Sequence, residues 1–99
     1  MATSPFAAAI YPAKFRAFDA NGDPLNGGKL YSYVAGTSTP FPTYPTYADA
    51  LAGTNANANP VILDANGEAN VFGQAAAYKF ALYDSANVLQ WTEDNVYVG

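Results

Sequence analysis

Apolar and polar residues alternate along several short segments of the chain, with the period of two that a half-buried β-strand requires. Residues 78–84, YKFALYD, place Tyr78, Phe80 and Leu82 on one face of such a strand. Residues 27–37, GGKLYSYVAGT, alternate in the same way. These patterns predict an all-β fold, a small antiparallel β-sandwich or jelly-roll-like domain of short strands and hairpins.

Three corners that begin with aspartate separate the predicted strands. The tetrapeptide DANG occurs at 19–22 and again at 64–67, and DSAN at 84–87 joins YKFALYD to a partner strand, VLQW, at 88–91. A type I turn favours Asp at its first position, and the left-handed residue that completes a bulged hairpin is usually Gly or Asn. The residues assigned to structural turns are Asp19, Gly22, Asp64, Gly67, Asp84 and Asn87.

The same corners imitate the opening of a calcium loop, with DANGD at 19–23 and DANGE at 64–68. An EF-hand needs glycine at its sixth position and a bidentate glutamate at its twelfth. The first segment has Pro and Leu at those positions and the second has Ala at both. Plain turns are therefore favoured over a calcium site, and no metal or cofactor is expected.

Composition narrows the classes of function. The chain has 99 residues, enough for one domain, and its 8 acidic and 4 basic residues give a net charge of -4, which argues against nucleic acid or an anionic membrane as a partner. It has no histidine or cysteine, which excludes Ser-His and thiol nucleophiles, disulfides and thiolate metal sites. Only 12% of the residues are charged and 51% are apolar, so we expect another chain to cover part of the surface.

The remaining routes to catalysis are weak. Glycoside hydrolysis can proceed with two carboxylates alone, but Glu93 and Asp94 are neighbours in sequence, which point away from each other in extended chain. We interpret them as part of a solvated exit segment. Gly27 and Gly28 precede a predicted strand rather than a helix, which argues against a phosphate loop. We expect a protein that is not an enzyme.

Residues 37–60 contain Pro40, Pro42 and Pro45, a repeated Pro-Thr-Tyr and then alternating Asn and Ala before Pro60. Neither a helix nor a strand is expected from the Asn-Ala stretch. The segment could be a polyproline ligand, but a crossover between two sheets is the favoured interpretation because prolines are normal at sheet edges. Tyr44 and Tyr47 would then be free to pack on a neighbouring chain.

The amino-terminal segment MATSPFAAAIYPAKF has an apolar run between Pro5 and Pro12 without the preceding positive charge of a signal peptide. We interpret residues 1–13 as an extended docking arm that presents Phe6, Ile10 and Tyr11, the alternative being a frayed terminus. Residues 14–95 would form the β-rich domain. Residues 96–99 would be an exit segment toward a distal fibre.

The order of these segments resembles the amino-terminal virion-anchoring, or head-binding, domains of bacteriophage tail fibres and tailspikes. The resemblance covers 15–96 and rests on a compound pattern: GGKLYSYVAGT, a proline-rich crossover, NPVILDANGEANVF, and YKFALYDSANVLQWTEDNV. It implies a structural protein of the virion tail or neck, made in the cytoplasm of the bacterial host. It also implies a homotrimer that docks on the portal, adaptor or another neck protein.

Two expectations about surfaces follow. For the anchor, contacts between chains are expected at Tyr31, Tyr33, Tyr44 and Tyr47. The alternative is a small carbohydrate-binding β-sandwich module that stacks sugar rings on exposed aromatic side chains, since the chain has 8 tyrosines and one tryptophan.

Overall fold

The computed structural model describes the backbone of residues 8–98 and the side chains of residues 14–97. In this part of the chain, strands dominate and there is one short helix. The elements are β1 (Ala8–Arg16), β2 (Lys29–Val34), α1 (Tyr47–Ala52), β3 (Val61–Ile62), β4 (Glu68–Gly73), β5 (Ala76–Tyr83) and β6 (Leu89–Val98). The prediction of an all-β fold is confirmed.

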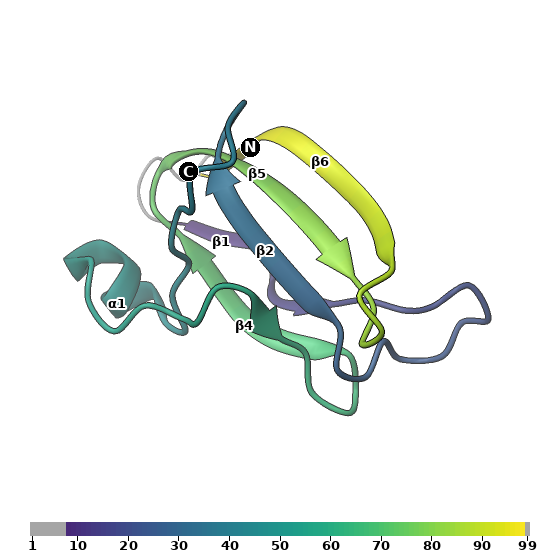
Figure 1. Ribbon diagram of the computed structural model, residues 1–99. Coiled ribbons are helices and arrows are strands. Elements are labelled where there is room, and N and C mark those ends of the chain that lie inside the picture. The colour runs from purple at the N-terminus through teal and green to yellow at the C-terminus, as the bar shows by residue number, and fades with distance from the viewer. Residues whose placement is uncertain (1–7, 99) are drawn as a thin grey trace.

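The strands form two antiparallel sheets that pack against each other (Figure 1). The larger sheet has the order β3-β2-β5-β6, and β1 pairs with β4 in the smaller sheet. Both segments with a predicted alternation contain a strand, β2 and β5. Strand β2 turns Leu30 inward, and β5 turns Tyr78, Phe80 and Leu82 inward. The buried side chains between the sheets form the core: Ala17, Leu25, Leu30, Val61, Leu63, Val71, Tyr78, Phe80 and Leu82.

Tyr78 is the centre of this core and is fully buried. Its ring stacks on Phe41 and on Phe80, with ring centroids 4.2 and 5.4 Å apart. Its hydroxyl donates a hydrogen bond to the carbonyl oxygen of Pro42 and accepts one from the backbone N–H of Gln74, at 2.7 and 3.0 Å. The buried phenol therefore ties the crossover segment to the turn between β4 and β5.

The three corners that begin with aspartate have the same hydrogen bonds. In the first corner, the Asp19 side chain accepts from two backbone N–H groups, those of Asn21 and Asp23, and the Gly22 N–H donates to the Asp19 carbonyl. The corners at 64–68 and 84–88 repeat every one of these bonds. The fourth residues, Gly22, Gly67 and Asn87, have φ values of +84°, +71° and +67°. One turn chemistry thus occurs three times, as the sequence predicts.

Residues 37–60 cross between the two sheets. After β2, the chain reaches the smaller sheet, where Tyr44 and Phe72 of β4 exchange backbone hydrogen bonds of 2.8 Å, and then returns to the larger sheet as β3. Helix α1 was not expected here. Thr46 caps its first turn by accepting from the Asp49 N–H, and Gly53 ends it in the left-handed conformation. The alternating Asn-Ala stretch that follows α1 is neither helix nor strand.

Two predicted boundaries fall inside strands. The arm predicted at residues 1–13 overlaps β1, whose pairing with β4 begins at Ala8, so the border between 13 and 14 falls inside a strand. The exit segment predicted at 96–99 overlaps β6, which pairs with β5 as far as Val98. Neither β1 nor β6 has the regular alternation of apolar and polar residues that made residues 27–37 and 78–84 recognisable as strands.

Candidate interaction surfaces

Most of the carboxylates hold the fold in place. Asp19, Asp64 and Asp84 bind backbone N–H groups in the corners, and Glu68 forms an ion pair with Arg16. Asp94 was expected in a solvated exit segment, but it lies in β6 and accepts from the Gly36 N–H at 2.9 Å. Within residues 8–98, no three His, Cys, Asp or Glu side chains are grouped so that they could hold a metal ion.

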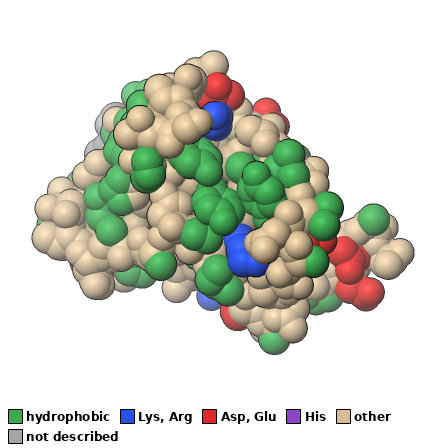
Figure 2. All heavy atoms as spheres, in the orientation of Figure 1, with side chains coloured by type: hydrophobic (Ala, Val, Ile, Leu, Met, Phe, Trp, Pro, Cys, Tyr) green, Lys and Arg blue, Asp and Glu red, His purple; other side chains and the backbone are tan. Residues whose placement is uncertain are grey.

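The outer face of the larger sheet carries a group of tyrosines. Tyr31 and Tyr33 are two residues apart on β2 and their rings are parallel, with an interplanar angle of 1° and centroids 6.3 Å apart. Tyr83 of β5 meets Tyr31 edge to face at 5.3 Å. The ammonium group of Lys79 lies 5.3 Å from the centre of the Tyr33 ring. We call Tyr31, Tyr33 and Tyr83 the tyrosine face, and Figure 2 shows hydrophobic side chains gathered over this side of β2 and β5.

The tyrosine face is only partly open to solvent. All three tyrosines are half-buried. Burial raises the pKa of the Tyr33 phenol above its ordinary value, and the neighbouring Tyr83 and Tyr31 add to the increase. The three rings therefore pack against one another and also form a partly exposed surface.

The other residues expected at contacts between chains lie in different settings. Tyr44 is 3% exposed and packs with Ala50 and Phe72 in a second small core, so the expectation that it contacts another chain is wrong. Tyr47 is 39% exposed on α1. Tyr44 and Tyr47 are thus not part of the tyrosine face.

The docking arm is only partly within the described residues. Phe6 lies outside them. The backbone of Ile10 and Tyr11 belongs to β1. An extended conformation was expected for these two residues, and β1 has it, but as part of the smaller sheet.

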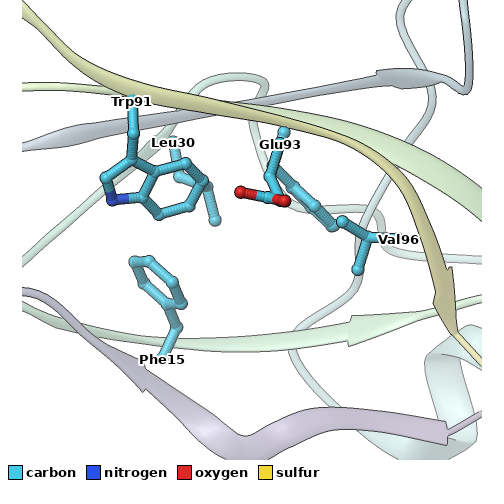
Figure 3. A pocket seen from close by; sticks show the side chains of 6 residues that line it. Phe15, Leu30, Trp91, Glu93 and Val96 are labelled. Atoms are coloured by element: carbon cyan, nitrogen blue, oxygen red, sulfur yellow. The ribbon is translucent and has the colours of Figure 1, made fainter.

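A second surface, which the sequence did not reveal, lies between β1 and β6. Each is a strand at one edge of its own sheet, and they meet where the Phe15 and Trp91 rings touch edge to face, with ring centroids 6.5 Å apart. Beside them is an apolar hollow of about 170 Å³, into which Phe15 points from β1 and Trp91 and Glu93 point from β6 (Figure 3). Leu30, Phe80 and Val96 complete its lining. We call this side of the sandwich the open side.

Strand β6 adds exposed apolar surface to the open side. Each of its side chains from Leu89 to Tyr97 is exposed except that of Val96, which is half-buried. Trp91 is 39% exposed and Tyr97 is 72% exposed. An edge strand of ten residues with this much exposed apolar surface is the kind of edge that invites pairing with another chain.

No protein-family model matches the chain, and no curated protein matches it. In the part of the chain that the structure describes, no helix has the length and hydrophobicity to cross a membrane.

Proposed function

We propose that this chain is a structural virion protein, the domain that anchors a bacteriophage tail fibre or tailspike to the portal, adaptor or another neck protein. It acts as a homotrimer in the tail or neck of the virion, after synthesis in the bacterial cytoplasm. Its function is assembly through protein surfaces, without catalysis, a cofactor, nucleic acid or a membrane.

The observation that carries this proposal is the open side between β1 and β6. There, large apolar side chains such as Trp91 and Leu89 are exposed on an edge strand, and an apolar hollow lies between β1 and β6. Burying apolar surface contributes roughly 25 cal/mol per Å² before the entropy of association is subtracted. An anchor must hold its place by contacts of this kind, and the low content of charged residues, 12%, fits a surface that another chain covers.

The resemblance to virion-anchoring domains adds support. The quoted segments cover the main structural parts of the domain. GGKLYSYV contains β2, and VILDANGEANVF contains β3, the second corner and most of β4. YKFALYDSANVLQWTEDNV contains most of β5, the third corner and most of β6. The carboxylates in these segments largely stabilise turns, which is in keeping with a structural protein.

The tyrosine face favours a second candidate, the carbohydrate-binding module. Parallel rings such as those of Tyr31 and Tyr33 can stack on sugar rings. Against it, Lys79 already lies over the Tyr33 ring, and the three tyrosines are half-buried. The observation is therefore weaker than the open side.

The solution mass separates the two candidates. Light scattering across a dilution series is expected to give about three times the monomer mass of 10.4 kDa at every concentration. A monomer that binds oligosaccharides in a calorimetric screen, and loses that binding when Tyr31 and Tyr33 are replaced by alanine, would instead support the carbohydrate module and refute the trimeric anchor.

A further inference from the structure

The open side has two free strand edges. Strand β1 pairs only with β4, and β6 pairs only with β5, among the residues that the structure describes. Each strand therefore presents one row of backbone N–H and C=O groups without a strand neighbour. Such edges can accept a strand from another chain by continuing the sheet.

The two edges run in opposite directions. Phe15, near the end of β1, touches Trp91, near the beginning of β6. At the other end of the sandwich, Ala8 pairs with Gly73 and Val98 pairs with Ala76, only three residues further along the chain. The first residue of β1 is thus close to the last residue of β6, and the strands are antiparallel across the open side.

The two edges also differ in charge. β1 carries Lys14 and Arg16, and β6 carries Glu93 and Asp94. Arg16 is engaged with Glu68, and Asp94 with the Gly36 N–H. Lys14 and Glu93 both have exposed side chains, one on each edge. Opposite charges on the two edges favour contact between unlike edges and disfavour contact between two copies of the same edge.

We propose that β6 of one copy pairs in antiparallel fashion with β1 of the next copy, around an axis parallel to the strands, so that the open sides of all copies face the axis. The inference rests on the proposed self-assembly and names its seam. Because the unlike edges lie on the same side of each copy, such a contact closes into a ring instead of continuing as a filament. Every free edge on the open side is then paired, and the hollow is enclosed.

Symmetry fixes the register. Rotation about an axis parallel to the strands leaves the height along that axis unchanged, so residues level with one another within a copy are also level between copies. Phe15 is level with Trp91, which places Lys14 opposite Thr92 of the next copy. The faces agree as well: Phe15 and Trp91 both point inward, while Thr92 pairs with Ala81 on the outer face of the larger sheet.

Paired cysteines test this register, because the chain has no cysteine of its own. Facing residues of antiparallel strands have Cα atoms about 4.5–5.5 Å apart, within the reach of a disulfide. Lys14→Cys and Thr92→Cys are made in separate chains of different length, both at exposed positions. The chains are unfolded, mixed, refolded together and oxidised. The expected product is a covalent dimer of one chain of each kind, with little dimer from either variant alone.

The matched control replaces Thr92→Cys by Lys79→Cys, on the outer face of β5, one strand further into the sheet. It is expected to give at least tenfold less mixed dimer with Lys14→Cys. A chain that carries both Lys14→Cys and Thr92→Cys is expected to form a covalent ladder that ends at the number of copies in the ring.

Several outcomes would overturn the seam. Oligomers seen by light scattering that form no mixed disulfide would reject it and leave the anchor function standing. Equal disulfide formation by Lys14→Cys alone would indicate pairing of like edges, which also rejects it. A monomer at all concentrations would reject both the seam and the trimeric anchor.

Discussion

The corners at Gly22 and Gly67 provide a matched test of how the second corner is packed. Both glycines complete the same turn with similar φ values, +84° and +71°. A Cβ atom on Gly22 would meet nothing within 4 Å, whereas one on Gly67 would lie 2.5 Å from the Ala17 carbonyl oxygen and 2.8 Å from the Leu25 nitrogen. The two substitutions to alanine therefore share the cost of the left-handed conformation and differ in the backbone contact.

The expected free energies of unfolding follow from these two terms. The left-handed conformation costs alanine roughly 1 kcal/mol at either corner. At Gly67 the Cβ would also push apart two backbone hydrogen bonds, from the Ala17 N–H to the Gly67 carbonyl and from the Leu25 N–H to the Ala17 carbonyl, each contributing about 1 kcal/mol. Gly22→Ala should cost about 1 kcal/mol and Gly67→Ala about 3 kcal/mol.

Urea unfolding followed by the fluorescence of Trp91, the single tryptophan, measures the difference. Both variants must be compared at one protein concentration, because association would add to stability. A difference of about 2 kcal/mol corresponds to melting temperatures about 8–16 °C apart for a domain of this size. If Gly67→Ala is no less stable than Gly22→Ala, the close approach of Gly67 to the backbone of Ala17 and Leu25 does not constrain the fold, and the reasoning fails.

Two further predictions concern the core and the crossover. Tyr78→Phe should lower stability by about 1–3 kcal/mol, because it leaves the Gln74 N–H and the Pro42 carbonyl without their hydrogen bond in the core. Burial raises the pKa of Tyr78, so the folded state favours the neutral phenol. The resulting contribution to the free energy of unfolding is complete below the ordinary tyrosine pKa and is lost as pH rises through the pKa of Tyr78 in the folded state. In a pH series of melting curves, Tyr78→Phe should therefore lose less stability at alkaline pH than the unchanged protein does. Thr46→Ala should cost about 1 kcal/mol by removing the cap of α1, and unchanged urea midpoints would contradict that role.

The sequence predicted the parts of the fold that depend on local rules. Alternation located β2 and β5 because one face of each strand is buried and the other is not. The three corners were also accessible, since Asp at the first position and Gly or Asn at the fourth act within five residues. These features are determined by neighbours in sequence and need no knowledge of the partner strand.

The missed features depend on contacts between distant residues. Tyr44 was expected on the surface because its surroundings are rich in proline, but the crossover brings it against Phe72 of β4 and buries it. Strand β6 has exposed side chains on both faces from Leu89 to Asn95, so its sequence lacks the alternation of a half-buried strand and its end was interpreted as an exit segment, just as the first part of β1 was interpreted as an arm. For α1, the signal was present in Thr46, Asp49 and Gly53, but the prolines before it and the Asn-Ala stretch after it concealed it.

The edge of β6 on the open side lacks most of the features that protect the edge of a sheet. A sheet edge in a monomer is usually protected by charges, prolines or a covering segment. Here β6 has ten residues with two acidic side chains near its middle, one of which, Asp94, bonds within its own chain. The charge that remains, Glu93, has an exposed side chain beside the apolar hollow. A neighbouring β1 supplies the missing strand, and its Lys14, opposite Thr92, brings a positive charge to an edge whose own charges are acidic, which is why the two open edges are best understood as halves of one contact.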